Sequence, residues 1–375
     1  MTIRAQLIER FLRYVAIESQ SDAKATTLPS TPGQQRLADL LAGELRALGL
    51  ADVVVDDRAT VTAVKRGNRR GAPRIGFIAH LDTVDTGLSP VIRPQILRFE
   101  GDDLCLNREQ DIWLRVADHP EIARWSGADI LFSDGTSVLG ADNKAAIAII
   151  MTLLATLGPD DAHGDIAIAF VPDEEIGLRG AKALDLARFP CDFAYTIDCC
   201  EVGEVVIENF NAAAGEIVFT GVSAHPMSAK GVMVNPLLMA HDFIAAFDRE
   251  NFGRRKRRVA DVADAIAARY PTGRVACSVT DTYGNISDSL GDDRRSVDRL
   301  FAAMAELEIQ PKLIPMRGGT DGAALSARGL PTPNFFTGAY NFHSRFEFLP
   351  LPAFETAFSV ARALCREPAA TELLS

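Results

Sequence analysis

The stretch that decides the fold is RIGFIAHLD, residues 74–82, an apolar run of strand length that ends in a histidine and an aspartate. Two later runs have the same form, IAIAFVPDEE at 166–175 and FAYTID at 193–198, and the apolar, helix-like NKAAIAIIMTLLATL occupies 143–157. Strands that alternate with helices predict an α/β fold, with a mixed sheet covered by helices. Ligands of such sheets bind beyond the carboxyl ends of the strands. The polar residues that end these runs therefore mark the candidate site.

The flanking sequence extends this pattern in both directions. Apolar residues at helical spacing predict further helices at 3–15, 34–48, 181–187, 296–306 and 352–365. Residues 86–135 are rich in Pro, Gly and Asp, so we expect an irregular surface excursion there.

The character of the chain changes near Asn211. An alternating strand begins at 212, helical periodicity runs almost unbroken from 236 to 268, and RVACSVTDTY at 274–283 reads as another strand. We therefore expect a discontinuous catalytic domain, residues 1–211 with 287–375, and a small inserted α+β domain, residues 212–286.

Composition and charge narrow the function classes. The chain has 375 residues, 47% of them hydrophobic, and its 39 basic and 50 acidic residues give a net charge of −11. This charge argues against nucleic-acid partners, which a basic surface binds. There is no apolar run of membrane-span length and no signal-peptide pattern at the N-terminus. Six cysteines without CxxC spacing indicate reduced thiols, so we expect a cytoplasmic enzyme.

Five residues of metal-ligand type stand at the ends of hydrophobic runs, namely His80, Asp142, Glu175, Asp198 and His343. Gathered at one sheet edge, such histidines and carboxylates can hold two metal ions. Glu174 adds a second carboxylate, and in a two-metal site one of the pair ligates while the other moves a proton. Asp82 can orient His80 through the second ring nitrogen.

Each of these residues, taken alone, also fits a plain structural role. His80 with Asp82 is common turn material, Asp142 can cap the helix that follows it, and Glu174 with Glu175 can form an exposed acidic turn. It is the combination that favours a metal site.

Two further segments could contact a substrate. His225 ends the first strand of the inserted domain, where it could polarise a carbonyl or simply occupy a turn before proline. The loop RGGTDG begins with Arg317, Gly318 and Gly319. Arginine binds carboxylates through paired hydrogen bonds, so a substrate carboxylate is a natural guest.

At this point the chain resembles the peptidase T family, a branch of the dinuclear-zinc exopeptidases. The resemblance covers most of the chain and is carried by long motifs in the family's order: TLPSTPGQ, GFIAHLDT, LGADNKAA, HGDIAIAFVPDEEIG, YTID, AHPMSAKGVMVN and RGGTDGAALSARGLPTPNFFTGAYNFHS. It implies a cytoplasmic, zinc-exopeptidase-like enzyme that releases the N-terminal residue from tripeptides.

The resemblance also implies how the ligands are divided between two zinc ions. His80, Asp142 and Asp198 would bind one zinc, and Asp142, Glu175 and His343 the other. The Asp142–Asn143 peptide bond is expected to be cis, and Asn143 stands where the family often has a second aspartate.

Other roles follow from the same resemblance. Asp82 would orient His80, Glu174 would be the general base for a metal-activated water, and His225 would stabilise the oxyanion. Arg317, Gly318 and Gly319 would hold the main chain or the C-terminus of the peptide.

The chain departs from the family pattern in two places. Cys199 and Cys200 stand where the family has glycine. Small residues there imply tight packing near the metals, so we expect the two thiols to perturb the site or to make it sensitive to oxidation. The family lid is a β-α-β-β-α-β unit, but here its middle strands and a substrate-contacting arginine are missing. Three readings stay open: a tripeptide aminopeptidase, a related two-zinc dipeptidase or amidase, and a metal-binding protein with impaired catalysis. Some relatives pair through the lid, so a homodimer is a candidate state.

Overall fold

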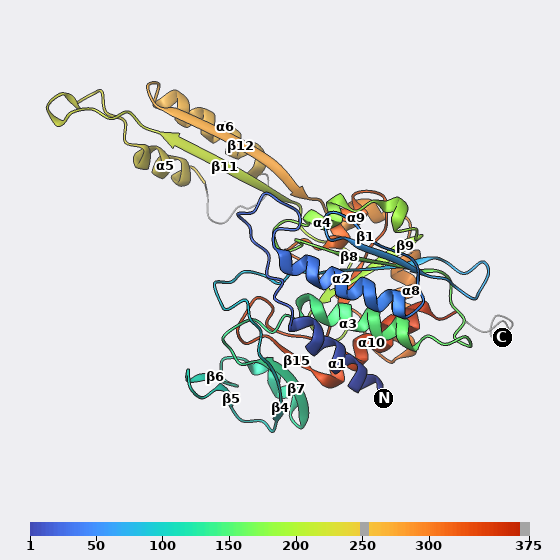
Figure 1. Cartoon of the computed structure of the whole chain (residues 1–375). Coiled ribbons are helices and arrows are strands. Elements are labelled where there is room, and N and C mark those ends of the chain that lie inside the picture. The colour runs from blue at the N-terminus through green and yellow to red at the C-terminus, as the bar shows by residue number, and fades with distance from the viewer. Residues whose placement is uncertain (248–254, 368–375) are drawn as a thin grey trace. The chain divides into compact units, whose positions relative to one another are not determined.

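The fold was analysed in a computed structural model that describes residues 1–247 and 255–367 (Figure 1). The chain divides into two compact units. The first comprises Met1–Phe210 and Asn285–Ser375, and the second comprises Asn211–Gly284. None of the helices within the described ranges is both long and apolar enough to cross a membrane.

The first unit is built on a mixed eight-stranded sheet. Its strands, in spatial order, are β1 (Ala51–Val55), β2 (Val61–Lys65), β8 (Ile166–Val171), β3 (Ile75–His80), β9 (Phe193–Cys199), β14 (Asn334–Phe336), β10 (Glu204–Val206) and β13 (Lys312–Leu313). The central strands β8, β3, β9 and β14 are parallel, whereas β1, β2 and β10 join by antiparallel pairing. The predicted α/β class with a mixed sheet is confirmed. Parallel centre strands place several carboxyl ends at one edge.

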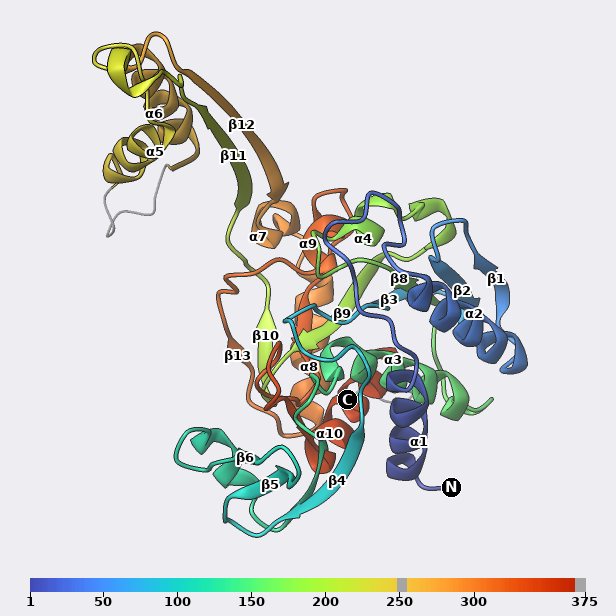
Figure 2. The same ribbon diagram turned by 60° about the vertical axis from the view of Figure 1, so that its left-hand side comes forward.

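Helices cover both faces of this sheet (Figures 1 and 2). On one face α3 (Ala141–Thr156) packs against β3 and β9, with α1 (Ile3–Val15), α10 (Leu351–Cys365), α8 (Arg295–Glu306) and α2 (Pro32–Ala47) on the same side. On the other face lie the short helices α4 (Arg179–Ala183), α9 (Asp321–Ser326) and α7 (Ile286–Leu290). A 3₁₀ turn, Leu186–Arg188, follows α4 in the sequence. Nearly every residue of α3 is buried, as expected for a helix that is apolar all round.

The excursion at 86–135 is not irregular, and that expectation was wrong. It contains β4 (Pro94–Phe99) and β7 (Ala128–Ser133), which form a three-stranded antiparallel sheet with β15 (Phe348–Pro350). A hairpin of β5 (Leu104–Asn107) and β6 (Ile112–Leu114) and the 3₁₀ helix Pro120–Trp125 complete it. Its core includes Tyr340 and Phe348. Local sequence did not reveal this sheet because one of its strands, β15, begins 215 residues after the end of β7 (348 − 133).

The second unit contains β11 (Ala212–Thr220), β12 (Arg274–Tyr283), α5 (Pro236–Ala245), α6 (Arg255–Arg269) and the 3₁₀ turn Pro226–Ser228. The helical periodicity predicted over 236–268 thus corresponds to two helices, and its part at 248–254 lies outside the described residues. The strands β11 and β12 pair with each other in antiparallel register along their whole length. One edge of each strand is therefore hydrogen-bonded within the unit.

Candidate active site

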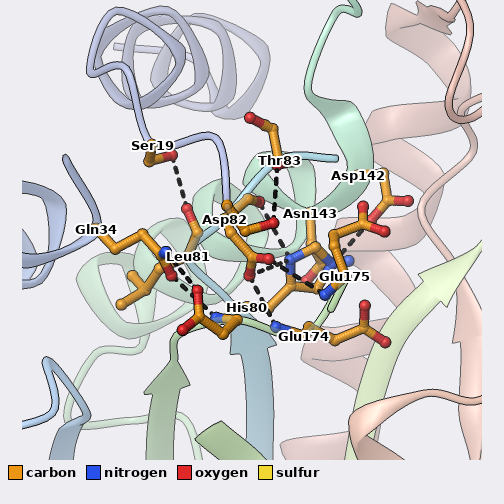
Figure 3. Close-up of polar contacts among 12 residues, drawn as sticks. Ser19, Gln34, His80, Leu81, Asp82, Thr83, Asp142, Asn143, Glu174 and Glu175 are labelled. Carbon is orange, nitrogen blue, oxygen red and sulfur yellow. Dashed lines mark hydrogen bonds and ion pairs between the residues drawn. The ribbon is translucent and has the colours of Figure 1, made fainter. Parts of the chain in front are cut away.

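The predicted metal ligands meet at the carboxyl ends of the parallel strands. Figure 3 shows His80, Asp142 and Glu175 there, with Asp82 and Glu174 beside them. His80 is the last residue of β3, and Asp198 lies near the end of β9. Glu174 and Glu175 follow β8, whose Val171 is in register with His80. Asp142 stands at the start of α3. Topology therefore brings together side chains that are far apart in the sequence.

Asp142 lies at the centre of two clusters of ligand atoms. One oxygen, Oδ1, is 2.8 Å from Nε2 of His80, and the other, Oδ2, is 3.1 Å from Nε2 of His343. The first cluster is completed by Asp198 and the second by Glu175, and within each cluster the ligand atoms lie within 4.8 Å of one another. A carboxylate that turns one oxygen to each cluster has the arrangement of a bridging ligand.

The electrostatics of the clusters suit cations. Burial and the charge of Asp142 raise the pKa of Asp198 well above its ordinary value and also raise the pKa of Glu175. Glu175 Oε1 is buried and finds no hydrogen-bond partner among the described residues. Hydrogen bonds with Asp142 and Glu175 raise the pKa of His343 to about 11, so its imidazole carries positive charge against these carboxylates. Such a donor set of imidazoles and crowded carboxylates fits metal ions.

Asp82 connects three parts of the site. It is fully buried, and its Oδ1 lies 3.3 Å from Nδ1 of His80. The same oxygen accepts the backbone N–H of Glu174 (3.0 Å), and Oδ2 accepts that of Glu175 (3.2 Å). Burial by itself would raise the pKa of Asp82, but the bond with His80 and the neighbouring amide and ammonium groups lower it. Asp82 is thus an ionised anchor for His80 and for the turn after β8.

Glu174 is buried beside the ligand atoms, and its side chain groups with His80 and Glu175. Burial raises the pKa of this carboxyl group well above its ordinary value, and the charge of His80 opposes this effect. The negative charges of Glu175, Asp321 and Asp198 raise it further. A carboxylate with a raised pKa is a stronger base once it is ionised.

Asn143, Cys199 and Cys200 lie within two residues of the candidate ligands Asp142 and Asp198 in the sequence. Asn143 Nδ2 donates hydrogen bonds to Asp198 Oδ1 and to the carbonyl of Ile197, both at 2.8 Å. The Asp142–Asn143 peptide bond is cis, as expected. Burial raises the thiol pKa values of Cys199 and Cys200, which disfavours their reactive thiolate forms.

The predicted substrate-binding residues, unlike the buried carboxylates of the metal clusters, are mostly exposed. Arg317 and Gly318 are exposed and Gly319 is half-buried, in the loop that leads into α9. His225 belongs to the second unit, where it is exposed and its Nδ1 accepts the backbone N–H of Met227 at 3.2 Å. That contact is the turn role considered for His225 from the sequence.

Sequence reasoning missed three buried charged residues near the ligands: Lys144, Asp321 and Glu347. Lys144 Nζ donates to the carbonyls of Leu81 (2.7 Å) and Asp82 (2.9 Å), and so supports the turn after β3. Asp321 begins α9, and burial raises its pKa to about 7. Each of the three stands within four residues of a predicted site residue in a mostly apolar or glycine-rich stretch, and this was the available signal.

Comparison with known proteins identifies the family. The sequence pattern of peptidase family M20/M25/M40 matches residues 140–367. The chain belongs to this family. Within it, the chain is 62% identical to a peptidase T-like protein of Rhizobium meliloti (strain 1021), over 99% of this chain and 100% of that protein. It is 39% identical to peptidase T of Geobacillus sp. (strain WCH70), over 92% and 94% of the two chains.

Structural comparison shows that the fold occurs in a solved structure. The crystal structure of aminopeptidase PepT from Bacillus cereus ATCC 10987 matches with a TM-score of 0.74 and 22% identity, over 96% of this chain and 98% of that one. The alignment with the Rhizobium relative runs over 409 positions, 34 more than the 375 residues of this chain. That relative therefore has residues that this M20 peptidase lacks.

Proposed function

We propose that this M20 peptidase is a two-metal aminopeptidase that releases the N-terminal residue of tripeptides. The observation that carries the proposal is the double role of Asp142, which turns one oxygen toward His80 and the other toward His343. The 39% sequence identity to peptidase T of Geobacillus supports the choice of tripeptides as substrates. The six free cysteines fit the reducing environment of a cytoplasmic enzyme.

The proposed ligands divide into two sets that share Asp142. His80, Asp142 and Asp198 would hold one ion, and Asp142, Glu175 and His343 the other. Zinc suits this combination of imidazole and carboxylate, although cobalt and manganese accept the same donors. Bound there, the ions would supply Lewis-acid polarisation of the scissile carbonyl and of water.

The chain's own residues would position the reactants and move protons. A carboxylate oxygen of Glu174 takes a proton from the attacking water and returns it to the leaving amine nitrogen. Asp82 holds His80 in a fixed ring orientation. His225 is proposed to stabilise the oxyanion, and Arg317 with the two glycines after it to hold the C-terminal part of the peptide.

The length of the lid supports a second candidate. The relative at 62% identity has at least 34 positions that this chain lacks. If these positions belong to the lid, as the missing middle strands imply, the shorter lid accepts substrates of a different length. A dipeptidase or an amidase with the same metal centre is then the alternative, and a homodimer formed through the lid is a candidate assembly.

Metal analysis and a paired substrate assay test the proposal. We expect two ions per chain, and cleavage of a free tripeptide but not of its N-acetylated form. Glu174→Gln should lower kcat by about two to four orders of magnitude, with two ions still bound. Glu44→Gln is the matched control. Glu44 is on α2 and accepts a hydrogen bond from the hydroxyl of Tyr14 on α1, so its replacement should leave turnover unchanged.

The other results separate the alternatives. Cleavage of dipeptides or blocked substrates in preference to tripeptides would move the assignment to a dipeptidase or amidase. Two bound ions without hydrolysis of any of these substrates would mean a metal-binding protein. Full activity of the Glu174→Gln variant would refute the role of Glu174 as base.

A further inference from the structure

Glu347 is a fully buried carboxylate that binds a single short segment of backbone. Its Oε2 accepts the N–H groups of Leu139 and Gly140, each at 2.8 Å, and its Oε1 accepts the N–H of Asp142 at 3.1 Å. Both oxygens are thus occupied by neutral amide donors. Burial of a carboxylate is unfavourable, and three hydrogen bonds to one turn are its compensation.

The bound segment is the irregular start of α3. Gly140 precedes the helix in a left-handed conformation (φ 74°), and no side chain of its own caps the helix. Asp142 and Asn143 have non-helical backbone angles inside this first turn. The first amide groups of a helix lack internal partners, so Glu347 satisfies from a distant part of the chain what a local capping residue would satisfy.

Glu347 is also connected to His343, four residues earlier. Its own N–H donates to the carbonyl of Ser344 (3.1 Å), and the N–H of Phe346 donates to Ser344 Oγ (3.1 Å). Tyr340 and Phe348 exchange backbone hydrogen bonds at 2.9 and 3.1 Å and close the segment around them. The turn that carries His343 therefore ends in the carboxylate that holds Asp142.

We propose that Glu347 is a positioning residue that sets the separation between Asp142 and His343, and with it the metal affinity of the Asp142–Glu175–His343 cluster. Glu347 joins the two segments that carry these ligands, because its side chain binds the N–H of Asp142 and its own N–H closes the turn that follows His343. Between these segments, Asp142 Oδ2 lies 3.1 Å from His343 Nε2. The inference rests on the proposed function for the presence of metal. It adds a residue outside the ligand set that holds two of the ligands in register, as the outer partners of metal ligands do.

The variant Glu347→Gln tests this, because glutamine keeps the volume but has only one acceptor oxygen. If that oxygen keeps Leu139 and Gly140, its NH₂ group faces the N–H of Asp142. Metal-free protein is titrated with Co²⁺, followed by calorimetry and by the visible absorption of the bound ion. We expect binding at the Asp142–Glu175–His343 cluster to lose roughly 10–100-fold in affinity, so that one of the two binding events weakens and the other changes less.

The control is Asp56→Asn, another carboxylate that accepts two backbone N–H groups in a turn, those of Arg58 (2.9 Å) and Thr60 (2.8 Å). It lies between β1 and β2 at the edge of the sheet, and its replacement should leave both Co²⁺ affinities unchanged. Rescue by Glu347→Asp, which restores the charge and both acceptors on a shorter side chain, should be partial.

The outcomes are distinguishable. If the wild-type protein binds fewer than two Co²⁺ ions, the proposed function fails. If the wild type binds two and Glu347→Gln binds both within threefold of its affinities, only the role of Glu347 is overturned. An equal loss at both sites, or a loss that Asp56→Asn reproduces, would mean general damage and would also overturn it. Should Glu347→Gln not fold, Glu347→Asp is titrated in its place against the same thresholds.

Discussion

Replacement of Asp82 by asparagine tests whether one buried carboxylate positions both His80 at the end of β3 and the Glu174–Glu175 turn after β8. Oδ1 of Asp82 serves the His80 ring and the N–H of Glu174, whereas Oδ2 serves only the N–H of Glu175. The single oxygen of asparagine will therefore take the Oδ1 position, where two groups bind it. Its NH₂ group then faces the Glu175 amide, donor against donor.

The magnitude follows from the group left without a partner. A buried donor that loses its acceptor costs about 1–3 kcal/mol. Mutation of the outer carboxylate partner of a ligand histidine, here to a neutral amide, lowers metal affinity by roughly 10–100-fold, which corresponds to about 1.4–2.8 kcal/mol. We thus expect the metal-free variant to lose about 1–3 kcal/mol of unfolding free energy, and to bind metal at the His80 cluster 10–100-fold more weakly.

The pH dependence gives this prediction a second readout. The folded-state pKa of Asp82 is below the ordinary value of 3.8. Its ionised form therefore contributes stability above pH 3.8, and this contribution disappears as the pH falls through the lower folded-state value. The difference between wild type and Asp82→Asn should accordingly shrink in acid.

Urea denaturation and metal titration of wild type and variant are the assays. Asp165→Asn is the matched control, because Asp165 also accepts a backbone N–H, that of Gly67 at 2.7 Å, but lies at the surface beside Arg66. The reasoning is refuted if Asp82→Asn is no less stable than this control and binds metal with wild-type affinity.

Two further predictions test the packing and the charge of the first unit. The folded-state pKa of Asp321 is about 7, above the unfolded value of 3.8, so metal-free wild type should lose on the order of 2–3 kcal/mol of unfolding free energy as the pH rises from 5 to 8. The variant Asp321→Asn should not show this loss; identical pH profiles of wild type and variant in urea denaturation would contradict the prediction. In α2, Gly33→Ala should destabilise the protein by about 1–3 kcal/mol, since the added methyl group would overlap the carbonyl oxygen of Glu18. Gly43→Ala in the same helix, where the methyl group meets no atom within 4 Å, should stabilise it by about 0.5–1 kcal/mol; similar effects at both sites would show that the contact with Glu18 does not matter.

Much of the architecture could be predicted because it depends on local patterns. Alternating apolar runs and helical periodicity indicated the strands and helices around the mixed sheet, and the fold class is confirmed. The excursion at 86–135 escaped prediction because its central strand β7 pairs with β15, which follows His343 in the sequence. Pairing between distant segments leaves no periodic signal in either of them.

The sequence by itself determined which chemical groups stand at the ends of the strands, and through its motifs the peptidase family. His80, Glu175 and Asp198 are polar residues that end apolar runs, and the parallel order of β8, β3 and β9 brings such residues to one edge. Their roles as metal ligands stay a prediction for the titrations above.

Only the tertiary structure decided how those groups are held. The contacts of Lys144 with the turn after β3, of Asp82 with two amides after β8, and of Glu347 with the start of α3 join parts of the chain that are about 60–200 residues apart. Distances of about 3 Å between such segments are set by packing of the whole sheet and its helices. A hydrogen bond needs both partners within a few tenths of an ångström, and that precision arises only when the complete fold has formed.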